Sequence, residues 1–237
     1  MAHPGEDIGQ ETLRRMSALE RYNDWIFRAI RPWIGRRVLE VGSGIGNFSH
    51  YFLDREQLIL TDIRDDYLNR LRERYGAFGN VAVERYDLEV SGGHISDYRV
   101  DTVISLNVLE HIDDDRLALA ESYSLLAPGG RIILQLPAHK VLYGSLDINL
   151  DHFRRYTVRD IRRKLAACGF EIEHIRRFNM FGAFGWFFAS RVLRRRILPE
   201  GQLGLFNLLT PFFMAVERII PVPIGLSLLV IGRKPLR

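Results

Sequence analysis

The sequence predicts an α/β fold in which a doubly wound, mostly parallel sheet carries helices on both faces. Three observations favour it. Short apolar runs alternate with helical segments along most of the chain, which is typical of parallel strands joined by crossover helices. Runs such as TVISL and IILQL are apolar at nearly every position, as expected for strands buried on both faces. The first strand also leads into a glycine-rich turn.

Helical periodicity predicts a leading helix over residues 12–34, where Pro32 ends the pattern. Strands and helices then alternate through residues 36–137. The predicted strands cover residues 36–41, 57–62, 80–86, 100–106 and 131–136, and the predicted helices between them cover 46–54, 65–74 and 113–126.

The alternation stops after the fifth strand. Residues 138–156 form a connection rich in His, Tyr, Asp and Arg, and loops this long inside a compact domain are commonly functional. We therefore expect a substrate loop here. Thr157 is placed to cap a following helix, which Gly169 would end.

An apolar insertion separates the last two strands, which are predicted at residues 170–177 and 226–232. Residues 178–224 predict two apolar helices interrupted at Pro199 and Gly201. Aromatic side chains beside arginines in this segment suit an acceptor lid or peripheral contact with a membrane. Packing on the sheet or against a second subunit in a homodimer is the alternative. We favour packing or a lid over membrane contact.

Length and composition limit the classes of protein to consider. The 237 residues are 47% apolar and 26% charged, which excludes disordered and fibrous chains. No polar linker is visible, so we expect one domain over residues 1–237. The single cysteine, Cys168, excludes a disulfide framework. The polar N-terminus lacks the apolar segment of a signal peptide, and no run reaches about 18 apolar residues, so we expect a cytoplasmic protein.

The charge is divided unevenly along the chain. Residues 1–150 hold 17 Lys and Arg against 23 Asp and Glu, whereas residues 151–237 hold 16 against 6. The second part can meet a phosphate, an acidic membrane surface or nucleic acid, or it can be a solvated arginine-rich face. Because lysine is scarce and no recognition module is present, we do not expect nucleic acid as a partner.

The strongest local signal is the turn Gly42-Ser43-Gly44-Ile45-Gly46, directly after the first strand. Glycines let the chain turn sharply and let a ligand approach main-chain atoms. Asn47 stands where the dinucleotide fingerprint GxGxxG has its third glycine. A nicotinamide or flavin cofactor is therefore disfavoured.

Polar residues end the next three strands. Asp62 ends the second strand and can accept hydrogen bonds from both hydroxyls of a ribose. Asp87 ends the third and can accept one from an exocyclic amine, while Asn107 and His111 follow the fourth. Because parallel strands end at one edge of the sheet, these side chains share that edge.

The stretches VLEVGSGIGNFS, LTDI, RYDL, DTVISLNVLEHI and LLAPGGRIILQLP lie in this order across residues 36–137. With them the chain resembles the class I S-adenosylmethionine-dependent methyltransferases. The resemblance implies a seven-stranded Rossmann-like fold, S-adenosylmethionine as cofactor and S-adenosylhomocysteine as product, with residues 36–137 as the cofactor-binding core. The residues it assigns to the cofactor are Glu40, Gly42, Ser43, Gly44, Gly46, Asp62, Ile63, Asp87, Leu88 and Asn107.

A second stretch, LDINLDHFRRYTVRDIRRKLAACGF, is similar to methyltransferases encoded with envelope or glycolipid biosynthesis genes. This likeness implies O- or N-methylation of a small-molecule, sugar or lipid-linked acceptor. The alternative is a catalytically inactive module that binds the cofactor and acts as an assembly partner.

Three histidines are candidates for a general base, since each can titrate near neutral pH. They are His111, His139 and His152. His111 can equally be a packing or capping residue beside the cofactor.

A neighbouring group of polar residues suits an anionic acceptor. We expect it to bind through Tyr143, Arg154, Arg155 and Tyr156. Adjacent arginines can bind a phosphate or carboxylate with forked hydrogen bonds. Alternatively, one arginine pairs with Asp147 or Asp151 and holds the loop closed. No spacing of His, Asp and Glu suggests a metal, because the consecutive residues Asp113 to Asp115 fit a helix N-terminus.

Overall fold

The computed structural model describes residues 8–90, 94–220 and 222–236, so the predictions for residues 1–7 lie outside it. Its centre is one seven-stranded sheet with the order β3-β2-β1-β4-β5-β7-β6. The strands are β1 (Arg37–Val41), β2 (Gln57–Asp62), β3 (Val81–Arg85), β4 (Thr102–Leu106), β5 (Arg131–Pro137), β6 (Glu171–Phe178) and β7 (Ser227–Arg233). Each predicted strand is confirmed to within two residues at either end.

The sheet is mixed only at one side. β1 pairs in parallel with β2 and β4, and β7 runs antiparallel between β5 and β6. The strand order reverses between β1 and β4, which is where ligands bind in open α/β sheets, beyond the carboxyl ends of the strands.

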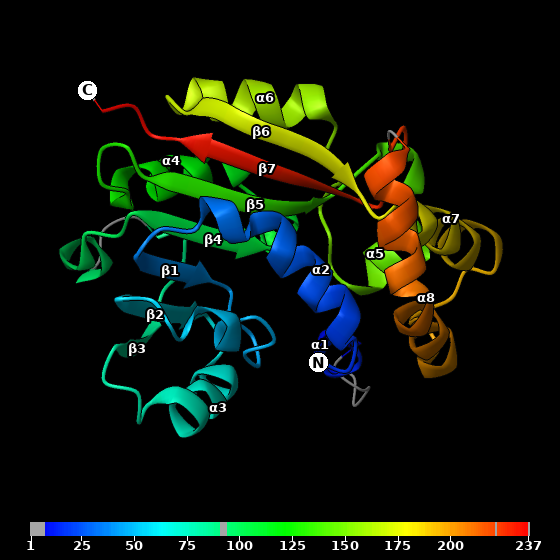
Figure 1. The fold of residues 1–237 in the computed structure, drawn as a ribbon, viewed down its shortest axis with the longest axis horizontal. Helices are drawn as coiled ribbons and strands as arrows, with labels where there is room; N and C mark the ends of the chain where they lie inside the picture. Colours follow the sequence, from blue (N-terminus) through cyan, green and yellow to red (C-terminus); the bar gives the residue numbers. More distant parts are fainter. Residues whose placement is uncertain (1–7, 91–93, 221, 237) are drawn as a thin grey trace.

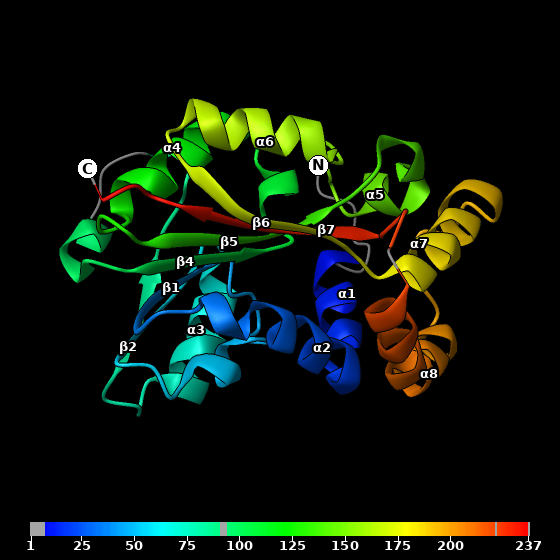
Figure 2. The ribbon, with the colours of Figure 1, turned by 45° about the horizontal axis from the view of Figure 1, so that its top comes forward.

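Helices cover both faces, as predicted (Figures 1 and 2). They are α1 (Ile8–Ser17), α2 (Glu20–Ile30), α3 (Asp65–Tyr75), α4 (Asp115–Leu125), α5 (Ser145–Asn149), α6 (Val158–Ala167), α7 (Met180–Phe187) and α8 (Glu200–Ile219). Successive residues of β1 face opposite ways, so Val38 packs in the core under α2 and α3, whereas Leu39 packs in the core under α4 and α6.

The leading helix is two helices, so its prediction as one element over residues 12–34 is wrong. The helix breaks at Leu19, whose backbone leaves the helical region at φ −89° and ψ 57°. The side-chain amide of Asn23 donates to the carbonyl of Met16 at 3.1 Å and satisfies one group freed by the break. The buried Leu19 therefore anchors the corner between α1 and α2.

The helix predicted over residues 46–54 is also shorter than expected. Only a 3-10 turn, Ser49–Phe52, forms there. Gly46 has a φ of +81°, which a right-handed helix does not tolerate, so the glycine turn extends into the predicted helix.

The insertion forms two helical elements before β7, as predicted. α7 continues into a π-helical turn, Phe188–Val192, and α8 begins after Pro199. The predicted interruption at Gly201 is wrong, because Gly201 lies within the first turn of α8. Glu217 of α8 accepts hydrogen bonds from the amides of Asn179 and Met180 at 3.2 and 2.5 Å, which joins the two helices. Figure 1 places both beyond the carboxyl edge of the sheet.

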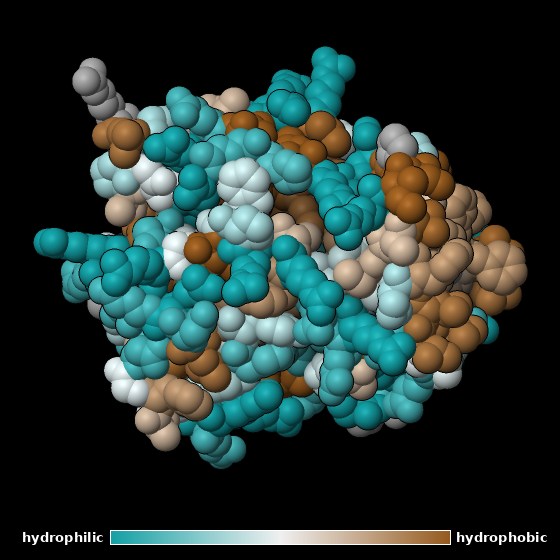
Figure 3. Space-filling view, in the orientation of Figure 1, coloured by the Kyte–Doolittle hydropathy of each residue, from teal (hydrophilic) through white to brown (hydrophobic). Residues whose placement is uncertain are grey.

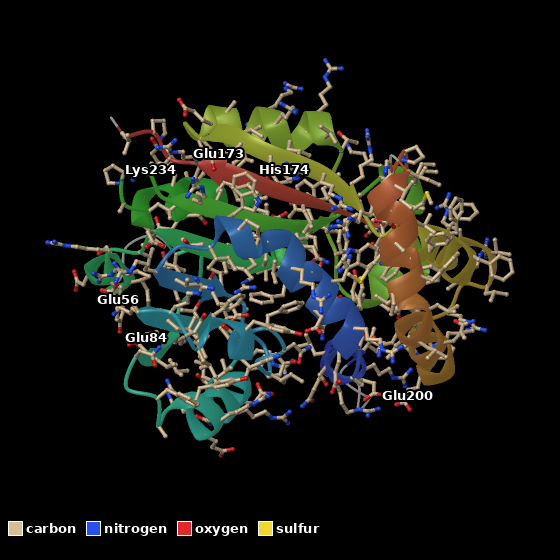
Figure 4. All side chains as sticks on the ribbon, viewed as in Figure 1. Glu56, Glu84, Glu173, His174, Glu200 and Lys234 are labelled. Carbon is tan, nitrogen blue, oxygen red and sulfur yellow. The ribbon has the colours of Figure 1, made fainter. Side chains whose placement is uncertain are left out.

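The start of α8 is also attached to the leading helix. Arg14 of α1 ion-pairs with Glu200, which is labelled in Figure 4. Arg15 donates to the carbonyl of Leu198 at 2.6 Å. Among the described residues, no helix combines the length and the apolar character needed to cross a membrane.

Candidate active site

The glycine turn has the backbone that only glycine adopts easily. Gly42, Gly44 and Gly46 have φ values of +66°, +55° and +81°. A Cβ on Gly42 would also lie 2.6 Å from a methyl carbon of Val108, just after β4. Ser43 fastens the turn to β2, because its amide donates to the carbonyl of Thr61 at 2.8 Å.

Asp62 lies at the end of β2 and supports this turn directly. Its carboxylate accepts hydrogen bonds from the amides of Gly44 and Arg64 at 2.9 and 3.0 Å, and the residue is 7% exposed. A carboxylate accepts about four hydrogen bonds. Asp62 therefore keeps the acceptor capacity that a pair of ribose hydroxyls needs.

The carboxylate of Glu40 is buried under the turn, and its nearest hydrogen-bond donor is a neutral hydroxyl. The hydroxyl of Ser49 donates to its carboxylate at 2.6 Å. Burial raises the pKa of Glu40 to about 7, and the negative charge of Asp62 adds to the shift. The site thus holds a carboxylate that would gain from a nearby ammonium group.

The remaining predicted cofactor residues surround the same edge. Ile63 is 55% exposed beside Asp62, which leaves an apolar surface free for an adenine ring, whereas Leu88 is buried. Asp87 accepts the amide of Glu89 at 2.9 Å. Asn107 has a φ of +55° and is exposed next to the turn.

Helix α1 covers the turn from outside. A Cβ on Gly44 would lie 3.2 Å from Leu13, and the side-chain amide of Asn47 donates to the carbonyl of Leu13 at 3.1 Å. The glycine turn, Asp62 and Glu40 lie together under this helix. The arrangement suits the adenosine and methionine parts of S-adenosylmethionine, with which the family resemblance agrees.

Two of the three predicted histidines meet beside this edge. His111 and His152 pack edge to face with ring centroids 4.7 Å apart. His111 keeps accessible surface but is recessed among protein atoms, and this burial, followed by the nearby His152, lowers its pKa to about 4. Glu110 lies beneath them, fully buried, and burial raises its pKa to about 7.

His152 is oriented by Asp147, a residue that the sequence analysis considered only as a closing contact. Asp147 is fully buried, and its carboxylate lies 3.0 Å from Nδ1 of His152 and 2.7 Å from Nε of Arg155. It also accepts hydrogen bonds from the amide of Gly144 and the indole of Trp186 at 3.0 and 3.2 Å. Although burial raises the pKa of Asp147, the hydrogen bond from His152 and the charge of Arg155 outweigh it.

The two adjacent arginines do not form the single fork that we predicted. Arg155 turns inward to Asp147, while Arg154 lies 3.1 Å from the carboxylate of Asp115. The chain is extended here, so neighbouring side chains point in opposite directions. Tyr156 is also buried, with its hydroxyl 2.9 Å from Asp115. The structure thus realises the alternative, a loop held closed by an arginine on Asp147.

Tyr143, the fourth residue predicted to bind the acceptor, holds the same loop. Its hydroxyl donates to the carbonyl of His152 at 2.8 Å. Its own carbonyl accepts a hydrogen bond from Arg191 of the insertion at 3.0 Å. The predicted substrate loop is therefore fixed to both the active-site edge and the insertion.

His139 is not part of this histidine pair and instead lines a basic cavity. The cavity has a volume of about 630 Å³ and is also lined by Arg159, Arg162, Arg163 and Arg177. None of these four arginines has an ion-pair partner among the described residues. Burial, followed by Arg177 and Arg155, lowers the pKa of His139. These arginines were not predicted as site residues, although the motif RDIRRK at the start of α6 contains three of them and Arg177 lies on β6.

A family model described as a methyltransferase domain matches residues 39–132, which contain the glycine turn and every polar strand end described above. Residues 39–132 are thus similar to a methyltransferase domain. S-adenosylmethionine is the cofactor that this domain and its fold imply, and the turn with Asp62 and Glu40 fits it.

Known relatives are similar to about half of the chain. The chain is 32% identical over 143 residues to "Probable polyketide synthase 42" of Dictyostelium discoideum, covering 50% of this chain and 5% of that protein. It is 28% identical over 146 residues to a "Probable S-adenosylmethionine-dependent methyltransferase" of Mycolicibacterium smegmatis, covering 59% and 53%. The chain thus spans only a small part of the first relative and about half of the second.

A solved structure agrees with the fold. The chain superposes on an S-adenosylmethionine-dependent methyltransferase from Mesorhizobium loti with a TM-score of 0.62 and 19% identity, over 91% of this chain and 99% of the other. The predicted Rossmann-like methyltransferase fold is therefore confirmed.

Proposed function

We propose that the chain transfers a methyl group from S-adenosylmethionine to a hydroxyl or amine of an anionic, lipid-linked acceptor. The methyl donor follows from the domain and from the fit of the glycine turn. The acceptor class is inferred from the basic cavity beside His139, which lies at the same edge of the sheet.

The four arginines of the cavity carry this proposal. Arg159, Arg162, Arg163 and Arg177 are all exposed and face one cavity. Uncompensated guanidinium groups around a recess suit a phosphate or diphosphate, which accepts forked hydrogen bonds from arginine.

The insertion adds an apolar surface at the same edge. Exposed side chains on α7, its π-helical turn and α8 form it, and they include Phe184, Phe187, Phe188, Leu205, Leu208 and Phe212. Figure 3 draws this surface in brown on the side of the molecule where α7 and α8 lie. Basic residues Arg191, Arg194 and Arg196 adjoin it and are exposed. We propose that this apolar surface contacts a membrane or the lipid tail of the acceptor.

The test is transfer of a labelled methyl group to a panel of lipid phosphates and to the same lipids without phosphate. We expect turnover only with the phosphorylated lipids. The variant Arg162→Ala, Arg163→Ala should raise KM by about tenfold or more, since each lost charged contact contributes about 1.5 kcal/mol or more. Cofactor affinity should stay unchanged, and Arg70→Ala on α3 serves as the exposed control.

The same experiment addresses the alternative of an inactive module. A chain that binds S-adenosylmethionine but transfers no label to any acceptor would favour the assembly role.

A further inference from the structure

Glu110, His111 and His152 bring three metal-binding atoms together, although they come from two distant parts of the sequence. One carboxylate oxygen and two imidazole nitrogens lie within 4.8 Å of one another. Nε2 of His152 is 4.0 Å from the carboxylate of Glu110. Bonds of about 2.1 Å to one ion place its ligand atoms at most about 4.2 Å apart. A small inward movement of the three side chains would therefore bring their ligand atoms within bonding distance of one ion.

The carboxylate of Glu110 is a second, independent observation. The residue is fully buried, and neither of its carboxylate oxygens has a hydrogen-bond partner within the part of the chain that the structure describes. A buried carboxylate without a partner is costly, and it is normally paired with a cation or bound to a metal. The basic groups that interact with this carboxylate, among the described residues, are the imidazole of His152 and the guanidinium of Arg155.

The ligands are held in place by the surrounding structure. Asp147 binds Nδ1 of His152, which directs Nε2 toward Glu110. Metal-binding histidines usually donate their other nitrogen to a carboxylate in this way. The amide of Phe153 donates to the carbonyl of Glu110 at 2.8 Å, which fixes the loop beside the ligands.

We propose that Glu110, His111 and His152 bind a divalent transition-metal ion. Two imidazoles and one carboxylate suit zinc, iron(II), manganese or cobalt better than magnesium or calcium, which prefer oxygen ligands. Three protein ligands leave coordination positions open, as in catalytic metal sites. His111 is accessible, so these positions face solvent and any bound acceptor.

The local charge favours a dication. Glu110 and Asp147 carry two negative charges when ionised, and Arg155 on Asp147 offsets one of them. Glu110 follows Val108 by two residues, and a Cβ on Gly42 would lie 2.6 Å from a methyl carbon of Val108, so the segment that carries Glu110 and His111 begins beside the glycine turn.

The use of the ion in catalysis rests on the proposed function, whereas its binding does not. An acceptor hydroxyl that coordinates the ion loses its proton to water more easily. Its oxygen then forms a bond to the methyl carbon as the bond from that carbon to sulfur breaks, leaving a neutral thioether. The metal therefore points to a hydroxyl rather than an amine as the acceptor.

The experiment measures metal binding without acceptor or cofactor. Protein stripped with a chelator is titrated with Zn²⁺ by calorimetry, and with Co²⁺ while visible absorption is recorded. We expect one ion per chain, and Mg²⁺ should not compete. Glu110→Gln and His111→Gln should each weaken binding by about 100-fold or more, since losing even an outer-shell partner costs about 10- to 100-fold.

Matched controls are Glu217→Gln, a second buried glutamate, and His174→Gln, a second exposed histidine. Both controls should bind Zn²⁺ as tightly as the unmodified chain. Circular dichroism checks that all four variants are folded. Because His111 is exposed, its variant tests the site even if Glu110→Gln does not fold.

No saturable Zn²⁺ binding, or binding that His111→Gln leaves intact, would overturn the proposal. In that case a proton neutralises Glu110. These outcomes leave the proposed methyl transfer untouched, since that is measured separately with labelled cofactor.

Discussion

Asp62 and Asp147 are both buried aspartates at the carboxyl edge of the sheet, but the structure gives them different partners. Asp62 accepts hydrogen bonds from two backbone amides of its own turn. Asp147 contacts four donors, which come from its own loop, from Arg155 and from the insertion. The carboxylate of Asp62 can still accept hydrogen bonds from a ligand, while the acceptor sites of the Asp147 carboxylate are all used by donors of the protein. The region around Asp62 is thus suited to binding a ligand, whereas the region around Asp147 holds the acceptor side of the site together.

The largest expected effect is the loss of stability when Asp147 is replaced. Asp147→Asn leaves Arg155 buried without its counter-charge, and breaking such a pair costs about 3–5 kcal/mol of unfolding free energy. Urea denaturation measures it. Asp113→Asn is the control, since Asp113 also ion-pairs with an arginine but is exposed, and surface substitutions change stability by about 0.5 kcal/mol or less. Equal stability of the two variants would contradict the structural role of Asp147.

Asp62→Ala should show the opposite division between stability and binding. It removes a charge-assisted pair of hydrogen bonds to the ribose, so cofactor affinity should fall by about 30- to 1,000-fold, or about 2–4 kcal/mol. Calorimetry with S-adenosylmethionine gives the dissociation constant, and nicotinamide dinucleotides should not bind. Asp66→Ala, at the start of α3, is the control, because Asp66 is exposed and its carboxylate ion-pairs with Arg64. An unchanged dissociation constant in folded Asp62→Ala would rule out the ribose assignment.

These two aspartates also differ in how far the sequence predicts them. The glycine turn and Asp62 follow two strands that are close in sequence, and parallel strands bring their ends to one edge of the sheet. The cofactor-binding residues were therefore predictable. Asp147 was only one of two options for a closing contact. Its role depends on Trp186 of the insertion, 39 residues away, and no local pattern encodes that contact.

The cluster around Glu110 shows the same limit. Glu110 and His111 are adjacent in sequence, but His152 joins them only because the loop returns and bonds to the carbonyl of Glu110. The prediction that Arg154 and Arg155 bind one anion failed for a related reason. They are neighbours in an extended segment, so their side chains point in opposite directions. The helical periodicity also continues through Leu19, although the chain turns a corner between α1 and α2 there to bury the Leu19 side chain.

Glu40 allows a test of the cofactor side by pH. Its folded pKa is about 7 against 4.5 in a model peptide, so the folded state holds a proton that the unfolded state releases between these values. Stability is therefore lost as the pH rises through this window, by about 1–3 kcal/mol. Among the described residues, the titratable groups Asp62 and Tyr75 interact with Glu40.

Glu40→Gln removes this titration while keeping an oxygen for the hydroxyl of Ser49. Its melting temperature should match the unmodified chain near pH 5 and exceed it increasingly toward pH 8. Parallel melting profiles from pH 5 to 8 would show that Glu40 is not the group responsible.

The smallest effect on stability is expected on the apolar surface of the insertion. Phe188 and Phe212 are 55% and 61% exposed, so replacing either with serine should change unfolding free energy by about 0.5 kcal/mol or less. If the surface inserts into lipid, each variant should bind anionic vesicles about 10-fold or more weakly, because burying a Phe side chain contributes about 1.5–3 kcal/mol. Flotation at rising salt should also release the protein, since arginines adjoin the surface. Phe78→Ser, which removes an exposed phenylalanine after α3, should leave vesicle binding intact. A chain that ignores vesicles but changes from dimer to monomer on Phe212→Ser would assign this surface to a second copy, and the membrane would lose its place in the proposed function.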